Sequence, residues 1–300
     1  MQSKEQWLEK RSQGVGASEM PAVMGVSPYT SQYKLWAHKT RRLGDEIENE
    51  DMYWGKKLEH IICDEYALRS ERAVQKCGPY DTNVHPDIPY MFATPDALTF
   101  RNGDDLGPGD DMGPVEAKMQ GRFAQKEWDE GAPLIYQIQL QAQMAVLGTD
   151  YGVLCGLVGK RFKSIEIERD DKFIDAMTDQ LHEFWDYVAN DTPPPMDGLA
   201  STARALKRMH PQDNGKTIKL SAEMSGILDG LIETRVLIKS HEEMETLQKN
   251  NLVAALKENT FGRLPDGRII SYKTIDVKPE KQPRDGYSYR RMGIKEAKNG

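Results

Sequence analysis

Two acidic residues and a lysine in the first half of the chain have the types and spacing of a metal-dependent hydrolytic site. Asp96 is followed twenty residues later by Glu116, and Lys118 stands two positions beyond Glu116. Alternate residues of a β-strand point to the same side. We therefore expect Glu116 and Lys118 to project together while Ala117 faces the core. If the strand that carries Asp96 pairs alongside, both carboxylates meet at the end of the sheet.

Two carboxylates and a backbone carbonyl are hard oxygen ligands that suit Mg²⁺ or Mn²⁺. Such an ion acidifies a bound water and stabilises the charge that develops on a scissile phosphate. Lys118 would orient or deprotonate that water, with its pKa lowered by desolvation and by the cation. The bare pattern is weak, because 47 acidic residues make chance matches expected in this chain. The competing interpretation is a Glu–Lys pair on a solvated strand face.

The segments around these residues have the patterns of two strands and two helices. We expect strands over residues 91–100 and 114–118, joined by a polar, glycine-rich loop over residues 101–113. We expect a helix over residues 57–70, where apolar residues recur at helical spacing. We expect a second helix over residues 134–147, with a proline at its start and a glycine at its end.

Four blocks of the sequence resemble the lambda-exonuclease or YqaJ-like viral recombinase family, a branch of the PD-(D/E)xK nuclease superfamily. They match in order and at compatible spacing, and together they cover about residues 8–190. The blocks are RSQGVGASE at 11–19, YWGKKLE at 53–59, TPD at 94–96 with VEAK at 115–118, and the glutamine-rich YQIQLQAQMAVLG at 136–148.

The resemblance implies a role for each residue of the third block. Asp96 and Glu116 would ligate Mg²⁺, for which Mn²⁺ is a substitute, and the carbonyl of Ala117 would assist. Lys118 would serve the attacking water.

The second and fourth blocks would complete this site. Glu59 would reach toward the metal or its waters. Gln139 matches the motif glutamine of the family and would steady Lys118 or the nucleophile. Because the repeated glutamines blur the register, Gln137 and Gln141 stay open as alternatives, although solvent-facing positions suit them better.

The first block matches the positions that grip the 5′-phosphate of a DNA end. The resemblance assigns this role to Arg11 and Ser18, and Ser18 would cap a helix whose exposed N–H groups favour an anion. Thr94 would add a hydroxyl contact, and Arg122 and Lys126 are candidate DNA contacts.

Composition bounds the class of protein. A chain of 300 residues with 38% hydrophobic residues can bury a sizeable core. Three scattered cysteines exclude a four-cysteine zinc or iron–sulfur site. A net charge of −7 argues weakly against DNA binding, but a locally basic tunnel is compatible with it. The lack of a continuous apolar stretch of about 20 residues and the charged N-terminus predict a cytoplasmic protein with no membrane contact. The family resemblance implies that the cytoplasm is that of a bacterial host cell.

Three consecutive prolines mark the predicted domain boundary. We expect an exonuclease domain over residues 1–192, a proline linker over 193–198 and a C-terminal extension over 199–300. The extension should contain a long amphipathic helix over residues 222–259, a hairpin with its turn at 264–268, and a basic tail that is low in aliphatic residues and predicted to be disordered.

The predicted fold is an α/β restriction-endonuclease-like core, in which helices flank a central mixed β-sheet. The resemblance implies a 5′–3′ exonuclease that hydrolyses one strand of linear duplex DNA to 5′-mononucleotides in phage-type recombination. It also implies a homo-oligomer, a trimeric ring around DNA, and a single-strand annealing protein as partner. Two alternatives stay open: a metal-dependent endonuclease on the same core, and a non-catalytic DNA-end or recombination scaffold that assembles through the long helix.

Overall fold

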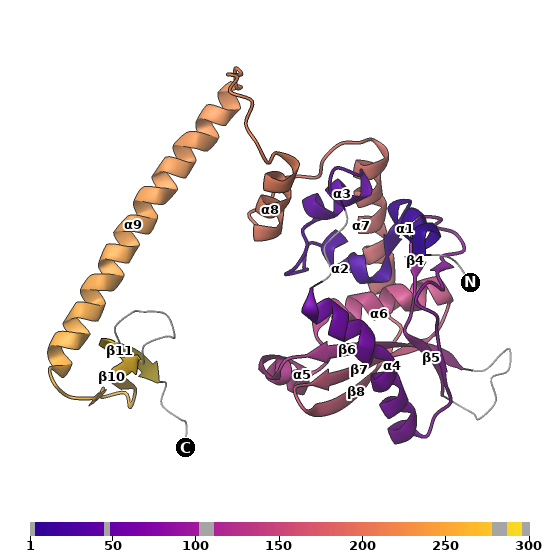
Figure 1. Ribbon diagram of the computed structural model, residues 1–300, viewed down its shortest axis with the longest axis horizontal. Helices are drawn as coiled ribbons and strands as arrows, with labels where there is room; N and C mark the ends of the chain where they lie inside the picture. The colour runs from indigo at the N-terminus through magenta and orange to yellow at the C-terminus, as the bar shows by residue number, and fades with distance from the viewer. Residues whose placement is uncertain (1–3, 45–48, 102–110, 278–286, 296–300) are drawn as a thin grey trace. The chain divides into compact units, whose positions relative to one another are not determined.

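The computed structural model describes residues 4–44, 49–101, 111–277 and 287–295 (Figure 1). The chain divides into two compact units, Met1–Asp213 and Asn214–Gly300. Most of the predicted loop over residues 101–113 lies outside the described residues.

A five-stranded mixed sheet forms the centre of the first unit, as predicted. Its strand order is β2-β5-β6-β7-β8, in which only β6 and β7 are parallel. A parallel pair needs a crossover connection, and the helical segment between β6 and β7 supplies it. The strands are β2 (Val74–Lys76), β5 (Ala97–Phe100), β6 (Met112–Gln120), β7 (Tyr151–Val158) and β8 (Arg161–Glu168).

Two long helices cover opposite faces of this sheet. Helix α4 (Glu50–Ser70) begins seven residues before the predicted start, because Asn49 caps it by accepting a hydrogen bond from the N–H of Met52. It packs on the face that carries Val115 and Ala117. Helix α6 (Leu134–Leu147) has the predicted bounds and packs on the other face. Glu116 and Lys118, which alternate with Ala117, therefore point to the α6 side.

The strand predicted over residues 91–100 is two strands in different sheets, so that prediction was wrong. Strand β4 (Met91–Ala93) pairs in parallel with β1 (Val15–Gly16) and antiparallel with β3 (Asn83–Val84). Strand β5 resumes at Ala97 in the central sheet. Pro95 lies at the break, where a residue without an N–H cannot continue a sheet ladder. Asp96 thus lies in the link between the end of β4 in one sheet and the start of β5 in the other.

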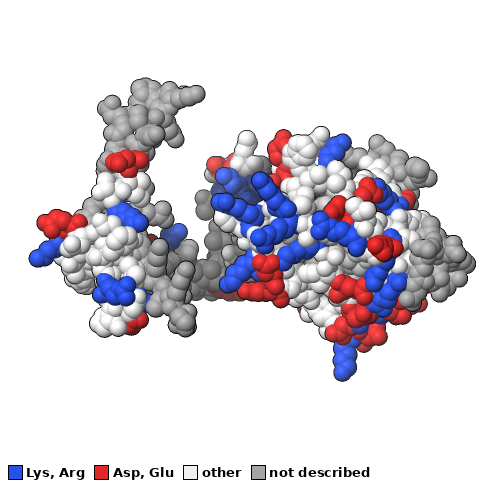
Figure 2. Space-filling model, turned by 90° about the horizontal axis from the view of Figure 1, so that it is seen from below, with Lys and Arg blue, Asp and Glu red and all other residues white. Residues whose placement is uncertain are grey.

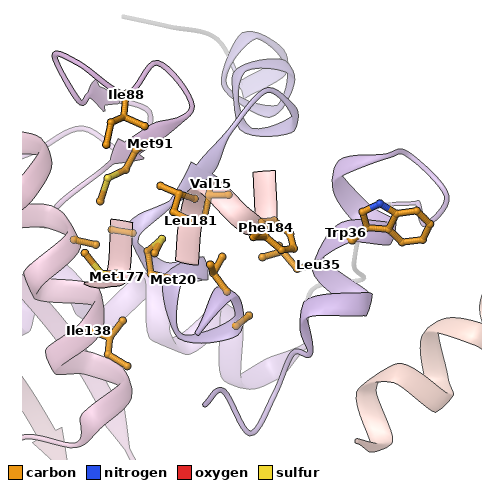
Figure 3. Packing of buried hydrophobic residues seen from close by; sticks show 14 of the residues in the cluster. Val15, Met20, Leu35, Trp36, Ile88, Met91, Ile138, Met177, Leu181 and Phe184 are labelled. Carbon is orange, nitrogen blue, oxygen red and sulfur yellow. The ribbon is translucent and has the colours of Figure 1, made fainter. Parts of the chain in front are cut away.

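A second layer of helices packs beside the small sheet and buries the largest apolar cluster. Figure 3 shows Val15, Met20, Met91, Ile138 and Leu181 converging there from separate elements. The remaining helices of the first unit are α1 (Lys4–Ser12), η1 (Ala17–Glu19), α2 (Met20–Val23), α3 (Gln32–Lys39), η2 (Arg122–Ala124), α5 (Gln125–Glu130), α7 (Asp171–Ala189) and α8 (Ala200–Met209).

The first unit extends past the predicted boundary. Residues 192–199, which include the triple proline, have no helix or strand, but α8 comes next and packs back onto the first unit. Ala205 is buried in the largest apolar cluster, and the hydroxyl of Thr202 donates a hydrogen bond of 2.7 Å to that of Ser31. The division therefore falls after Asp213 rather than at residues 193–198.

The second unit consists of one long helix and a small antiparallel sheet. Helix α9 (Ala222–Leu256) ends slightly before the predicted residue 259. The predicted hairpin joins β9 (Phe261–Arg263) to β10 (Ile269–Val277), and β10 also pairs with β11 (Tyr287–Lys295). The basic tail therefore contains a strand where we predicted disorder. Across the described residues, none of the helices combines the length and apolar content that a bilayer crossing demands.

Candidate active site

All four sequence blocks meet at one cavity of about 750 Å³ in the first unit. The α1–η1 segment, helix α4, the link before β5, strand β6 and helix α6 each contribute to its wall. The predicted site residues that line it are Arg11, Ser18, Glu59, Thr94, Asp96, Glu116, Lys118 and Gln139, and Tyr53 and Gln143 also belong to the wall. Segments more than a hundred residues apart are thus brought to one place.

The backbone around Asp96 is fixed to both neighbouring strands. Its N–H donates to the carbonyl of Val115 at 3.2 Å, and its own carbonyl accepts from the N–H of Cys77 at 3.0 Å. Its side-chain Oδ2 accepts from the N–H of Ala117 at 2.8 Å. These three bonds hold the Asp96 carboxylate against the middle of β6, beside Glu116.

Glu116 lies at the centre of the site and is 3% exposed. Its Oε1 forms an ion pair with Nζ of Lys118, which projects from the same strand face, as the strand alternation predicted. Its Oε2 accepts a hydrogen bond of 2.6 Å from Nε2 of Gln143 on α6. Both oxygens of this carboxylate are therefore oriented by neighbours.

The carboxylates perturb one another. Burial raises the pKa of Asp96 well above its ordinary value, and the nearby charges of Glu116 and Glu59 raise it further. Burial and Glu116 also raise the pKa of Glu59. The lowering of the Lys118 pKa was predicted for a site with a bound cation, and it stays a prediction. Burial does oppose the lysine charge, but Glu116 and Asp96 outweigh burial and raise its pKa.

This donor set fits a divalent cation that keeps part of its water shell. Burial, and after it the neighbouring carboxylates, raise the pKa of Asp96, and like charges crowded in a buried site favour a bound cation. Within the described ranges, no three His, Cys, Asp or Glu side chains converge in a ready-made metal cage. Mg²⁺ commonly needs only one or two carboxylates, with waters and substrate phosphate completing its shell. Asp96, Glu116 and the carbonyl of Ala117 are the residues that could hold it.

Tyr136 supports Lys118 from the α6 side. The ammonium of Lys118 lies 5.3 Å from the centre of the Tyr136 ring, within range of a cation–π contact. The phenol oxygen accepts a hydrogen bond of 2.7 Å from Nε2 of Gln120. The lysine is thus held between Glu116 and an anchored aromatic ring.

The glutamine-rich helix divides its glutamines between the site and the scaffold. Gln139 lines the cavity, as the motif predicted. The alternatives do not: Gln137 donates to the carbonyl of Ala132, and Gln141 fastens α6 to the end of β8 and the start of α7. Gln143, which the sequence analysis missed, is fully buried and contacts Glu116. Its place four residues after Gln139, on the same helix face, was the available signal.

The first block forms an ion network that the sequence did not reveal. Nη2 of Arg11 lies 3.0 Å from Glu19, and Nζ of the buried Lys39 lies 2.7 Å from the other oxygen of Glu19. The predicted cap by Ser18 was wrong. Ser18 lies inside η1, whose N-cap is Gly16, and Glu19 accepts the N–H of Gly16 at 2.9 Å. Ser18 instead presents an exposed side chain to the cavity.

The remaining predicted DNA contacts lie in two places. Thr94 lines the cavity. Arg122 and Lys126 do not: the Arg122 guanidinium covers the ring of Phe123, and Lys126 approaches Glu130 at 3.7 Å. Figure 2 shows Lys and Arg side chains gathered in a band on one face of the larger unit, with acidic side chains grouped beside it. A chain with a net charge of −7 therefore carries a locally basic surface.

Comparison with known proteins finds the same family. Residues 6–151 match the YqaJ-like viral recombinase domain, which spans the four blocks and nearly all of the cavity wall. The chain is 28% identical to the uncharacterized protein YqaJ of Bacillus subtilis (strain 168), over 98% of this chain and 95% of that protein.

Solved exonuclease structures are similar to the first unit. The alkaline exonuclease LHK-Exo of Laribacter hongkongensis is 25% identical, with a TM-score of 0.52 over 63% of this chain and 94% of that one. The structure of LHK-Exo in complex with dAMP is 26% identical, with a TM-score of 0.53 over the same shares. Together the family and these structures support a nuclease with a restriction-endonuclease-like core.

Proposed function

We propose that the first unit is a Mg²⁺-dependent exonuclease that hydrolyses one strand of duplex DNA from its end in the 5′–3′ direction. The observation that carries this proposal is the meeting of Asp96, Glu116 and Lys118 at the wall of a cavity of about 750 Å³. The relative LHK-Exo was solved in complex with dAMP, a deoxynucleoside monophosphate. A product of this class agrees with release of 5′-mononucleotides.

The residues of the cavity divide the work of the reaction. Asp96, Glu116 and the carbonyl of Ala117 would hold the metal ion, which when bound supplies charge stabilisation at the phosphate and a more acidic water. Gln143 orients the Glu116 carboxylate through its hydrogen bond of 2.6 Å. Gln139 contributes a further polar side chain to the wall.

Lys118 and Glu59 would act on the attacking water and on the proton that it loses. Lys118 is held as an ammonium by Glu116, so in this arrangement it donates hydrogen bonds and positions the water or the phosphate. Glu59 has a raised pKa and lies within electrostatic reach of both Glu116 and Lys118. A half-buried carboxyl with a raised pKa is a better proton acceptor than an ordinary glutamate.

The test of these roles is the Lys118→Ala variant. A positioned acid–base or orienting group contributes about 100- to 10,000-fold, so the cleavage rate should fall by that factor while DNA affinity and oligomer size are kept. Lys172→Ala is the matched control, since Lys172 is an exposed lysine on α7. A Lys118→Ala variant that cuts at the wild-type rate contradicts the proposal.

The wall formed by Arg11, Ser18 and Thr94 is proposed to bind the 5′-phosphate. Pairing with Glu19 uses Nη2 of Arg11, and a guanidinium has five N–H donors, so others stay available to an anion. Duplexes with 5′-phosphate ends should be degraded faster than the same duplexes with 5′-hydroxyl ends. Equal rates on the two substrates would remove this assignment.

The family resemblance adds partners as further proposals. Duplex DNA ends are the substrate, a single-strand annealing protein is a proposed partner, and a trimeric ring of the nuclease unit around DNA is the proposed assembly. With these partners, the nuclease would act in phage-type recombination in the cytoplasm of a bacterial host cell.

A further inference from the structure

An exposed aromatic ring and three basic side chains form a patch just beyond the end of strand β6. Phe123, in η2, is 89% exposed, more than any other large hydrophobic residue that the structure describes. The Arg122 guanidinium lies 5.1 Å from the centre of its ring. Lys160 and Arg161, where β7 turns into β8, are also exposed. These four residues are called the η2 patch below. A lone exposed apolar residue is common, so the basic neighbours are what make this ring a candidate contact.

The turn between β7 and β8 lies directly against the start of η2. The N–H of Gly159 donates to the carbonyl of Gln120 at 2.7 Å. A Cβ built on Gly159 would lie 3.4 Å from the Cα of Arg122, so the two backbones are in contact. Lys160 comes next along the chain. Residues almost forty positions apart are thus brought together in one patch.

Strand alternation gives the direction of Arg161. Ile165 and Ile167 of β8 pack in the apolar cluster on the α6 side of the sheet. Arg161 is an even number of positions before them and therefore points to the same side. Lys163 follows the same rule, because its Nζ donates to the carbonyl of Trp128 on α5 at 2.9 Å. Arg161 is thus directed to the side on which α5 lies.

The patch has an excess of positive charge. Within the described ranges, none of its three cations has a carboxylate at ion-pair distance. Two of the acidic residues of α5 are already paired, since Glu130 lies 3.7 Å from Lys126 and Asp129 contacts Lys163. The third, Glu127, is exposed. Three cations therefore stand against one unpaired carboxylate, which favours an anionic partner.

The patch lies near the candidate active site, on the same side of the sheet. Lys118 precedes Phe123 by five residues, a span of at most about 18 Å. Between them, Gln120 donates to the hydroxyl of Tyr136, whose ring centre lies 5.3 Å from the Lys118 ammonium. A DNA molecule held at Lys118 is therefore within reach of the patch.

We propose that the η2 patch binds single-stranded DNA, namely the strand that the nuclease leaves unpaired. Phe123 would stack on a base, while Lys160 and Arg161 would contact phosphates beside Arg122. An aromatic side chain can stack on any base with a free face, whereas the bases of a duplex already stack on one another. An open ring among unpaired cations therefore fits an unpaired strand better than a duplex. The inference rests on the proposed function, because digestion from a 5′ end leaves the other strand as a 3′ overhang.

The test is binding of fluorescein-labelled DNA by the full-length protein in EDTA, where no metal-dependent cleavage takes place. Two substrates share one duplex, which is blunt in the first and has a 3′ overhang in the second. Phe123→Leu should weaken binding of the overhang substrate about 5- to 100-fold, the loss expected for one base–aromatic stack. Binding of the blunt duplex should be unchanged. Phe123→Trp should keep the affinity, and Leu68→Ala, at an apolar position of α4 that is 75% exposed, is the matched control.

Two further readouts separate the charges from the ring. Lys160→Ala with Arg161→Ala should reduce the salt dependence of overhang binding by about 1.4 in the log–log slope, because each phosphate contact to a single strand contributes about 0.7. Lys172→Ala with Arg204→Ala removes the same charge at exposed positions of α7 and α8 and should leave the slope unchanged. The fluorescence of 2-aminopurine in the overhang should be quenched by the wild type and not by Phe123→Leu.

Three outcomes would overturn the inference. Phe123→Leu could bind the overhang substrate like the wild type. It could lose the same affinity for both substrates, which would mean that the ring contacts paired DNA. It could also lower the mass in sedimentation equilibrium without changing DNA affinity, which would mean that a second copy of the chain covers the ring. Because binding is measured without cleavage, a protein that binds the overhang through Phe123 but cuts no DNA would refute only the proposed nuclease.

Discussion

Replacing Glu19 with Gln should destabilise the first unit in a pH-dependent way. Glu19 links three segments by its contacts with Arg11, Lys39 and the N–H of Gly16. Its side chain is 18% exposed and that of Lys39 is 4% exposed, so solvent screens the Glu19–Lys39 pair little. The variant leaves the Lys39 ammonium buried without its carboxylate.

The size of the effect comes from the pKa of Glu19. Burial alone would raise this pKa, but Lys39, Arg11 and the Gly16 N–H outweigh burial and lower it from 4.5 to about 2. A drop of that size corresponds to about 3 kcal/mol of stabilisation. Burial lowers the pKa of Lys39 despite the attraction of Glu19, so part of this gain is offset. We expect Glu19→Gln to lower the free energy of unfolding by about 2–3 kcal/mol at pH 7.

The sign of the pH dependence is fixed by the lowered pKa. A carboxyl whose pKa is lower in the folded state stabilises the fold above its unfolded pKa of about 4.5, and this contribution is lost as the pH falls toward 2. The difference between wild type and Glu19→Gln should therefore be full at pH 7 and clearly smaller at pH 3.

Urea unfolding followed by tryptophan fluorescence measures the change in the stability of the first unit. All five tryptophans lie before Asp213, so the signal reports the first unit alone. Glu9→Gln, at an exposed position of α1, is the control and should change the free energy by less than about 0.5 kcal/mol. An equal loss at pH 7 and pH 3, or a loss below about 1 kcal/mol at pH 7, would show that Glu19 does not stabilise the unit in this way.

Three further predictions concern the site and its support. Gln143→Leu removes the hydrogen bond that orients the Glu116 carboxylate, so the cleavage rate at limiting Mg²⁺ should fall about 10- to 100-fold. The rate should recover as the Mg²⁺ concentration is raised. If it does not recover, Gln143 does not act through the metal site. Gly156→Ala places a Cβ 2.4 Å from the ring of Trp128, which should cost about 1–3 kcal/mol in thermal unfolding, whereas Gly121→Ala, with open space around it, should be neutral. For binding to duplex DNA, the logarithm of the association constant falls linearly with the logarithm of the salt concentration. Arg122→Ala should reduce the magnitude of this slope by about 1, and an unchanged slope would exclude a phosphate contact by Arg122.

The centre of the site could be predicted from the sequence because its geometry is local. Glu116 and Lys118 share a strand face by simple alternation, and the structure places both beside α6 with Ala117 on the opposite, buried side. The joint match of four blocks, rather than any single motif, predicted that Asp96 and Glu59 would lie at the same cavity.

The features that the sequence did not reveal depend on contacts between distant segments. The partners of Arg11 and Gln143 are set by how η1, α3 and α6 pack, which no local pattern specifies. The break at Pro95 had a local signal that the apolar run around it concealed. The effect of the protein groups on Lys118 also depends on such contacts, because the attraction of two adjacent carboxylates exceeds the effect of burial and raises its pKa.

The position of the unit boundary was also set by packing. A triple proline predicts an extended segment, and residues 192–199 have no helix or strand. The prolines carry no information about where the next helix packs. Buried Ala205 and the Thr202–Ser31 hydrogen bond fix α8 to the first unit.

Cleavage of linear against covalently closed circular duplex DNA, with Mg²⁺ or Mn²⁺ and with EDTA controls, is the decisive assay for the proposed exonuclease. We expect metal-dependent loss of the linear DNA while the circles stay intact. Cutting of the circles would keep the metal site but make the protein an endonuclease. Loss of neither substrate with either metal would contradict a catalytic role and favour a DNA-end scaffold.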